Sequence, residues 1–321
     1  MRLWFVCPDT DVPSGGVRVI HRCVEHLRAA GREAWVVHEQ PGFRPTWFTS
    51  AAPIAYAPSI DLAPGADVLV VPEIYGPGLG DIAPGVTKVI FNQNTSNTFA
   101  GYALPIRRGA TAYDHPEVGG AVCVSEDEAA VLRFAFPQLA VERVVLQVDP
   151  AIFHPGPKRR VLTYMPRKGA RDAARVLGLL GARGTLDDVE VRALQGLDEA
   201  GVAAAQRDAL LFLSFSVDEG WGLPPVEALA SGCLVVGFHG MGGREFLTPD
   251  LAWPVEQGDV LALARTAAGL LDRHREDPEP LEAHGRAAAA AIHARYTPQR
   301  EAASVVAAFE ALAAVPALTS R

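Results

Sequence analysis

The stretch that decides the fold lies in the second half of the chain and reads Glu219-Gly220-Trp221-Gly222-Leu223-Pro224-Pro225-Val226-Glu227. Residues 210–216, just before it, form a short apolar run of the kind that a buried parallel strand needs. Gly220 and Gly222 then allow the backbone to turn and to approach a ligand closely. We therefore predict a buried strand that runs into a glycine loop.

A helix and a second strand are predicted after this loop. Pro224 and Pro225 suit the first turn of a helix, where their missing N–H groups cost nothing. This assigns Glu227 to the first turn, where the helix dipole favours an acid. Gly232 is predicted to end the helix, and the apolar residues 234–236 to begin the next strand. The order strand, loop, helix, strand is typical of an α/β sheet.

Glu219 and Glu227 are the two carboxylates of this stretch, and both are predicted to face the crevice at the carboxyl ends of the strands. A carboxylate accepts hydrogen bonds from neighbouring hydroxyls, so two carboxylates one loop apart could hold two different sugar rings. The free N–H groups at the helix start suit a phosphate. Taken singly, Glu227 is more simply explained as an acid that complements the helix dipole, and Glu219 as a solvated loop acid.

The combination of these features resembles a known family. The run E-G-W-G-L-P-P-V-E-A-L-A-S-G at 219–232 is similar to the Glu-x7-Glu signature of retaining glycosyltransferases with the GT-B fold, the family 4 or glycosyltransferase group 1 type. The resemblance implies that Glu219 contacts hydroxyls of the transferred sugar and that Glu227 holds the ribose of the nucleotide. It also implies a donor site completed by the intervening loop, Gly220, Trp221, Gly222 and Leu223.

A second glycine loop lies near the start of the chain. Residues 3–7 are predicted as a strand and residues 17–30 as a helix, with Gly15 and Gly16 at the point where the helix begins. A lone Gly-Gly pair is weak evidence, because a plain turn explains it equally well. In the family that the chain resembles, a Gly-Gly loop after the first strand meets the donor phosphate, and this implies the same role for Gly15 and Gly16.

Arg167 and Lys168 follow the predicted first strand of the second half, at 160–165. Breaking the bond between an anomeric carbon and a diphosphate leaves extra negative charge on the departing phosphate, which fixed cations stabilise. The resemblance implies the same contact, although relatives space their Arg and Lys by several residues. The alternative is an exposed basic turn.

Acceptor-side candidates come from polar residues that follow two predicted strands of the first half, at 67–72 and 88–91. They are Glu73, Asn92 and Asn94, and solvated loops are the alternative. Many relatives carry a His close to the reacting sugar after the second of these strands. This chain has Asn92-Gln93-Asn94 there, a departure that leaves its acceptor chemistry open.

Composition limits the possible functions. The 321 residues suit two compact domains, and the formal net charge of −8 argues against nucleic acid as a partner. For Arg18, Arg22 and Arg28, and for 107–108, we favour a solvated face over weak contact with a membrane surface. We predict no transmembrane segment and a cytoplasmic, bacterial protein.

No metal and no cofactor are predicted to be required. The four cysteines lie far apart in the sequence, with no C-x-x-C pair and no histidine at the spacing of a metal site, so buried free thiols are expected. Asp9 and Asp11 match an Asp-x-Asp pair, which other glycosyltransferases use to hold a divalent metal on the donor. That pair normally follows several strands, not the first, so we interpret both residues as loop acids.

The predicted architecture is α/β with the GT-B fold, two Rossmann-like domains that face each other across a cleft. The boundaries are 1–149 for the acceptor-side domain, 150–158 for a linker, 159–294 for the nucleotide-sugar domain and 295–321 for a C-terminal helix packed back on the first domain. Residues 144–148 are predicted as the last strand of the first domain.

The predicted function is retaining transfer of a sugar from a UDP- or GDP-sugar to an acceptor hydroxyl. The acceptor is a glycan, a lipid-linked sugar or a small molecule, and the sequence does not choose among them. Two alternatives stay open: a degenerate GT-B protein that binds a nucleotide sugar or a protein partner without transfer, and a GT-B epimerase or phosphorylase.

Overall fold

A computed structural model describes residues 1–314, and it divides the chain into two compact units. The first unit combines Met1–Leu146 with the described part of Gln299–Arg321, and the second is Gln147–Pro298. The second unit thus begins before the predicted linker at 150–158. The last seven residues of the predicted C-terminal segment, 315–321, lie outside the described residues.

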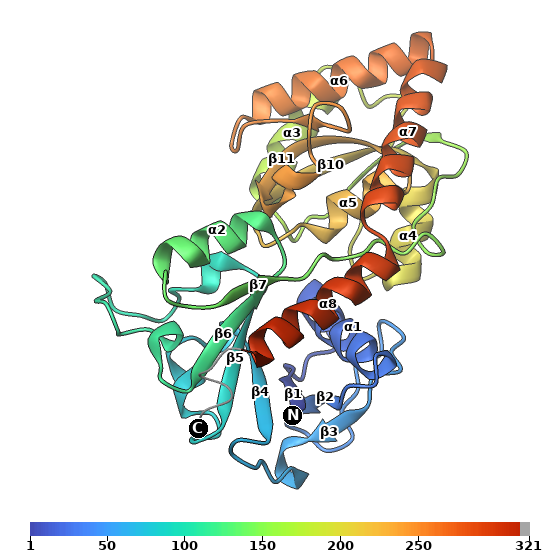
Figure 1. Cartoon of the computed structure of the whole chain (residues 1–321). Helices are drawn as coiled ribbons and strands as arrows, with labels where there is room; N and C mark the ends of the chain where they lie inside the picture. Colours follow the sequence, from blue (N-terminus) through green and yellow to red (C-terminus); the bar gives the residue numbers. More distant parts are fainter. Residues whose placement is uncertain (315–321) are drawn as a thin grey trace. The chain divides into compact units, whose positions relative to one another are not determined.

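The first unit is built on a seven-stranded parallel sheet in the order β3-β2-β1-β4-β5-β6-β7 (Figure 1). Its elements are β1 (Arg2–Val6), α1 (Gly15–Ala29), β2 (Ala34–His38), β3 (Ile54–Tyr56), β4 (Asp67–Pro72), β5 (Thr87–Asn92), β6 (Val118–Cys123), α2 (Glu126–Ala135), β7 (Val141–Arg143) and α8 (Pro298–Ala313). Four 3-10 helices lie between strands, at Ala57–Ser59, Glu73–Asp81, Thr95–Asn97 and Ala112–Asp114. All of its strand pairs are parallel, as a doubly wound sheet requires.

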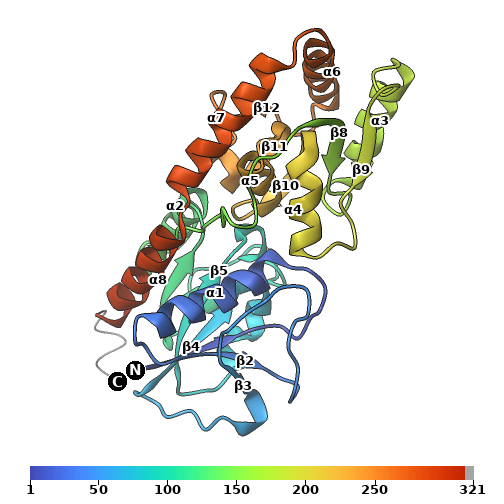
Figure 2. The same cartoon turned by 90° about the vertical axis from the view of Figure 1, so that its right-hand side faces the viewer.

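The helix α8 lies beside α1 in this unit (Figures 1 and 2). The buried carboxylate of Glu301 accepts hydrogen bonds from Arg22 Nη2 at 3.0 Å and is 2.9 Å from His26 Nε2. Phe309 packs edge-on against Phe5 of β1, with ring centroids 5.2 Å apart. Helix α8, near the end of the described chain, therefore completes the hydrophobic core around β1.

This packing corrects the prediction of a solvated basic face on α1. Arg18 is buried and Arg22 is held by α8. Of the three arginines predicted there, only Arg28 is exposed, and its guanidinium lies over the ring of Trp35.

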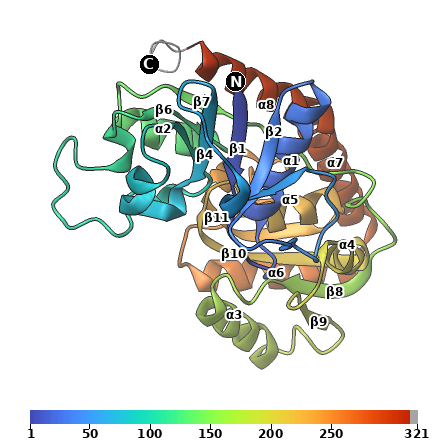
Figure 3. The ribbon, with the colours of Figure 1, turned by 90° about the horizontal axis from the view of Figure 1, so that it is seen from below.

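The second unit contains a five-stranded parallel sheet in the order β12-β11-β10-β8-β9. Its elements are β8 (Arg159–Tyr164), α3 (Ala170–Ala182), β9 (Glu190–Ala193), α4 (Glu199–Asp208), β10 (Ala209–Glu219), α5 (Leu223–Ala230), β11 (Leu234–Met241), a 3-10 helix (Gly242–Glu245), β12 (Trp253–Pro254), α6 (Val260–Glu276) and α7 (Glu279–Arg295). Figure 3 shows α3 and α6 on one face of this sheet and α4, α5 and α7 on the other. Buried side chains of α3, α6 and the central strands form one hydrophobic cluster.

The strand predicted at 144–148 is wrong in position. The structure has β7 at Val141–Arg143, paired with β6, and the buried valines that suggested a strand follow it. Two backbone N–H groups of 144–148 bond to groups outside any strand: Val145 donates to Ser304 Oγ and Val148 to the carbonyl of Tyr296. Apolar alternation here reflects burial of an irregular segment.

Within residues 1–314, every helix is too short or too polar to cross a lipid bilayer.

Candidate functional site

In the second unit, polar side chains converge at the carboxyl ends of β8 and β10. Lys168 lies in the turn between β8 and α3, and Glu219 is the last residue of β10. Lys168 Nζ is 2.7 Å from Glu219 Oε1, and the two side chains are 33% and 13% exposed. The sequence predicted that both residues belong to one site, and the structure brings them into direct contact. Arg167, in the same turn, is exposed.

Gly169 explains how Lys168 is held close to β10. It is the N-cap residue of α3 with φ of 76°, a left-handed conformation that favours glycine. A Cβ atom at this position would lie 2.9 Å from the carbonyl oxygen of Phe215 in β10. The turn therefore packs against the backbone of the neighbouring strand, which a larger residue would prevent.

The position of Glu227 differs from the prediction. Because Gly222 is the N-cap and α5 begins at Leu223, Glu227 is in the second turn instead of the first, and the first turn holds no acid. All residues of Pro225–Ala230 are buried, and Glu227 is 5% exposed. Complementing the helix dipole therefore does not explain this acid. Its role in holding the ribose of a nucleotide stays a prediction.

The side chain of Trp221, a residue predicted to belong to the donor site, lies in the interior of the second unit. Its side chain is buried and packs edge-on against Tyr296 and Phe246, at centroid distances of 4.9 Å and 5.4 Å. The indole thus anchors the loop in the core of the second unit.

A neighbouring segment, the turn after β11, contributes none of the predicted site residues. A Cβ atom on Gly242 would lie 1.8 Å from the carbonyl oxygen of Gly220, so the two backbones touch. Met241, one residue earlier, has φ of 73°, which is rare for a residue with a side chain. The signal that could have identified this segment is its density of glycines, at 240, 242 and 243.

In the first unit, a second polar group surrounds the start of α1. Gly15 and Gly16 are the first two residues of this helix. The side chain of Gln93 donates a hydrogen bond from Nε2 to the carbonyl of Gly16 at 3.2 Å. Glu73 accepts hydrogen bonds from Gln93 N–H at 3.0 Å and from Asn97 Nδ2 at 3.2 Å. Burial raises the pKa of Glu73, and these hydrogen bonds oppose part of the rise.

The two predicted asparagines have supporting positions in this group. Asn92 is completely buried, and its Nδ2 donates to Thr98 Oγ1 at 2.9 Å and to the Tyr113 hydroxyl at 2.5 Å. Its side chain is thus held in the interior of the first unit, and its role on the acceptor side stays a prediction. Asn94 accepts from Ser96 N–H at 3.0 Å and so caps the next 3-10 helix. Glu73, which is also buried, is the one acid among the three residues predicted on the acceptor side.

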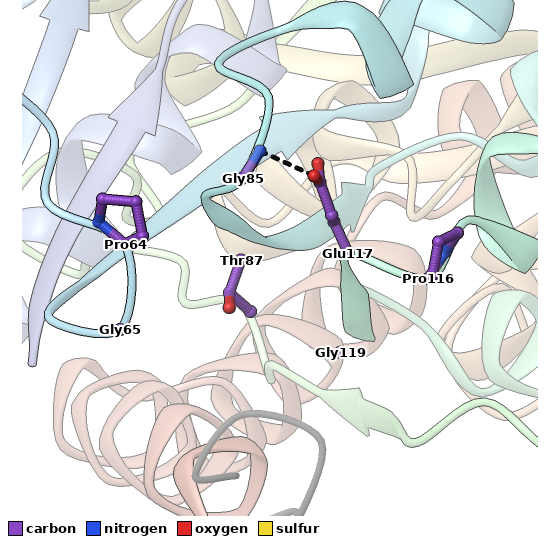
Figure 4. Close-up of a pocket in the computed structure, with 7 residues that line it drawn as sticks. All are labelled: Pro64, Gly65, Gly85, Thr87, Pro116, Glu117 and Gly119. Atoms are coloured by element: carbon purple, nitrogen blue, oxygen red, sulfur yellow. Dashed lines mark hydrogen bonds between the residues drawn. The ribbon is translucent and has the colours of Figure 1, made fainter. Parts of the chain in front are cut away.

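A small cavity of about 200 Å³ lies at the opposite end of the first sheet (Figure 4). It is lined by residues that precede or begin strands, among them Gly85, Thr87 and Glu117. Glu117 accepts the Gly85 N–H at 2.6 Å and pairs with Lys88 Nζ at 2.5 Å. These contacts join β5 to the loop before β6, and the cavity is separate from the carboxyl ends where the predicted residues gather.

Comparisons with known proteins connect this geometry to a fold. No family model matches the chain. An α-1,6-glucosyltransferase of Actinobacillus pleuropneumoniae is 47% identical over 47 residues, a match that spans 15% of this chain and 14% of that protein.

Solved structures match nearly the whole chain at low sequence identity. Sucrose-phosphate synthase of Thermosynechococcus elongatus has a TM-score of 0.70 at 13% identity, covering 97% of this chain and 99% of its own. A glycosyltransferase of Rickettsia africae scores 0.68 at 12% identity, covering 98% of each chain. HepE of Anabaena, solved with UDP and glucose, scores 0.68 at 13% identity, covering 97% of this chain and all of its own. The predicted α/β fold of the GT-B type is confirmed.

Proposed function

We propose that this chain is a retaining glycosyltransferase that moves a sugar from a nucleoside diphosphate sugar to an acceptor hydroxyl, with no metal or cofactor required for transfer. One observation carries the proposal: the ion pair of Lys168 and Glu219 at the carboxyl ends of β8 and β10, where the loop after Glu219 leads into the helix that holds the buried Glu227. A cation from the turn after β8 and two acids from β10 and α5 match the parts of a nucleotide sugar, which are an anionic diphosphate between two hydroxyl-bearing rings.

The proposed roles follow the charge of each group. Lys168 and Arg167 bind the diphosphate and stabilise the charge that it gains as the bond to the sugar breaks. Glu219 accepts hydrogen bonds from the transferred sugar, while its own charge holds the Lys168 ammonium in place. Glu227 binds the ribose hydroxyls. The N–H groups of 220–223, and those of Gly15 and Gly16 at the start of α1, are offered to phosphate oxygens.

In the proposed reaction, the bond between the anomeric carbon and the leaving diphosphate oxygen breaks, and a bond to the acceptor oxygen forms on the same face of the sugar. The departing phosphate oxygen takes the proton of the acceptor hydroxyl, so no side chain needs to act as the base. The donor is a UDP- or GDP-sugar, and the complex of HepE with UDP and glucose favours UDP. For the acceptor, a glycan, lipid-linked sugar or small molecule, Glu73 is the proposed contact, supported by Asn94 and by the buried Asn92.

Replacing Glu227 with alanine is expected to weaken the binding of the nucleotide at least tenfold, because the ribose hydroxyls would lose a charged acceptor. Calorimetry with UDP, GDP and ADP identifies the base on the wild type, and the preferred nucleotide is then titrated into the variant. Glu256→Ala, which removes an exposed acid of the same unit, is the matched control. An affinity for every nucleotide that is equal in Glu227→Ala and the wild type would contradict the assignment, provided that circular dichroism finds the variant folded.

Retention is tested by the configuration of the product. Incubated with an α-linked donor and no acceptor, the wild type is expected to release free sugar slowly, as the α-anomer first, because water would attack from the face that the leaving group occupied. Proton NMR, recorded before the anomers equilibrate, distinguishes the two. Release of the β-anomer would refute retention, and a requirement for inorganic phosphate would indicate a phosphorylase. Binding without any turnover of donor would favour the degenerate protein.

A further inference from the structure

Three buried side chains of the first unit meet at the carboxyl ends of β1 and β2, and the proposed transfer uses none of them. The sulfur of Cys7 and one ring nitrogen each of His21 and His38 all lie within 4.8 Å of one another. The residues are 1%, 1% and 0% exposed, respectively. Thiolates and imidazoles are the side chains that bind Zn²⁺ in proteins.

The topology explains why these residues meet although they are far apart in the sequence. Cys7 follows β1, and its N–H donates to the carbonyl of Val37, so it lies next to His38 at the end of the neighbouring parallel strand. His21 is on the buried side of α1, the helix that connects the two strands. Spacing along the chain could not have indicated this cluster.

The hydrogen bonds of His38 determine which of its nitrogens is protonated. Its Nδ1 is 2.9 Å from Asp9 Oδ1 and 3.2 Å from the carbonyl oxygen of Cys7. Both are acceptors, so Nδ1 carries a hydrogen. In the neutral ring, this hydrogen leaves the lone pair on Nε2, where a metal would bind.

The same reasoning applies to His21. Its Nδ1 is 3.0 Å from Ser50 Oγ, and that hydroxyl donates its one hydrogen to Glu25 Oε1 at 2.7 Å. Ser50 must therefore accept from Nδ1–H, which again leaves the lone pair on Nε2.

Within the described residues 1–314, neither Nε2 atom has a hydrogen-bond partner. The thiol of Cys7 can donate one hydrogen at most, so without a further group at least one buried lone pair stays unsatisfied, which is costly. A cation that accepts both lone pairs and a thiolate removes this cost. We propose that Cys7, His21 and His38 bind one Zn²⁺ ion.

The surroundings of the cluster support this assignment. Tetrahedral Zn²⁺ holds sulfur at about 2.3 Å and nitrogen at about 2.0–2.1 Å, so neighbouring ligand atoms lie about 3.3–3.6 Å apart. The three side chains, whose ligand atoms lie within 4.8 Å of one another, would close in to that spacing around the ion. The hydrogen bonds that His38 donates to Asp9 and that His21 donates to Ser50 are the kind of outer contact that orients metal-bound histidines. The charges of the ion, the Cys7 thiolate and the Asp9 carboxylate sum to zero.

The ion would be structural. It would join the residue that follows β1 to both α1 and β2, and thereby restrain the loop 8–14 that leads to Gly15 and Gly16. The rings of Phe43 and Phe48 pack against the two histidines, at centroid distances of 4.9 Å from His38 and 5.1 Å from His21, and a water molecule would complete the tetrahedron. This proposal does not depend on the transfer activity, and its ion is not on the donor diphosphate.

The whole chain is the sample for the test. Mass spectrometry of protein from zinc-supplied cells is expected to find about one Zn²⁺ per chain. After removal of the metal by a chelator, added Co²⁺ is expected to produce the absorption of thiolate-to-cobalt charge transfer and of a tetrahedral ion. Folded wild type that contains no zinc and gives no such absorption would overturn the proposal.

Variants assign the ligands. Cys7→Ala is expected to abolish the charge-transfer absorption and to weaken Zn²⁺ binding at least tenfold. Cys23→Ala, which removes a different buried thiol, located in α1, is expected to keep the absorption and the affinity. Asp9→Asn, outside the ligand set, is expected to keep the absorption and to lower the affinity about tenfold. If Cys7→Ala does not fold, the Asp9→Asn variant provides the test of the metal site. Charge transfer lost in Cys23→Ala, or affinity unchanged in Asp9→Asn, would contradict the assignment.

Discussion

Lys168→Ala is expected to lower kcat for sugar transfer by about 10²–10³-fold, equivalent to about 2.7–4 kcal/mol of transition-state stabilisation. The ammonium group, held 2.7 Å from Glu219, is the fixed cation proposed to meet the charge that develops on the departing phosphate. Its removal also leaves the Glu219 carboxylate uncompensated beside that phosphate, so repulsion is added to the lost attraction. The rate of nucleotide release from the donor measures the effect.

The fold should survive this substitution. Lys168 is a third exposed, and ion pairs in contact with solvent contribute at most about 1 kcal/mol to stability. Arg171→Ala, which removes an exposed cation from the first turn of α3, is the matched control and is expected to leave kcat unchanged. Lys168→Arg should retain part of the rate. If Lys168→Ala stays within about threefold of the wild-type kcat, the role of this residue in stabilising the leaving group is refuted.

Gly242→Ala is expected to lower the free energy of unfolding by about 2–3 kcal/mol and to impair nucleotide binding as well. The added methyl group would lie 1.8 Å from the carbonyl oxygen of Gly220 and 2.9 Å from the Cα of Trp221, both of them backbone atoms. Because Trp221 is anchored in the core, the strain has to displace the loop 220–222, whose N–H groups are proposed to bind phosphate. Urea denaturation and calorimetry with the preferred nucleotide measure the two effects.

The control for Gly242→Ala is Gly178→Ala. Gly178 lies in α3 with no other group within 4 Å of the added methyl, so the substitution is expected to raise stability by about 0.5–1 kcal/mol without changing affinity. Equal stability of Gly242→Ala and the wild type would mean that the backbone of the turn after β11 shifts at little cost to accommodate the methyl group. A destabilised variant with full nucleotide affinity would separate this turn from the donor site.

Local patterns predicted the framework of the site. The apolar run at 210–216 and the glycines after it determine a buried strand and a loop, because each depends on residues close in sequence. The same patterns did not locate Glu227 within its helix. The start of α5 depends on Gly222, whose left-handed conformation makes it the N-cap, and on burial of the helix in the second unit.

Other features depend on contacts that the sequence does not reveal. The ion pair of Arg22 depends on α8, because its partner, Glu301, is 279 residues away. Cys7 and His38 meet only because their strands are neighbours in the sheet. The steric need for glycine at position 242 is evident only from the backbone of Gly220, which lies against it in the folded structure. In each case tertiary contact, and not local propensity, decides the outcome.

The packing of α8 on the first unit has a consequence for the order in which the chain folds during synthesis. The second unit is one continuous segment, Gln147–Pro298, whereas the first unit takes Glu301 and Phe309 from the far end. When the ribosome has made the first 146 residues, Arg22 still lacks its carboxylate and Phe5 its aromatic neighbour. Domains usually fold in the order of their synthesis. Here the second unit, although translated later, is complete before the first, because the core of the first unit cannot be completed until α8 has been made.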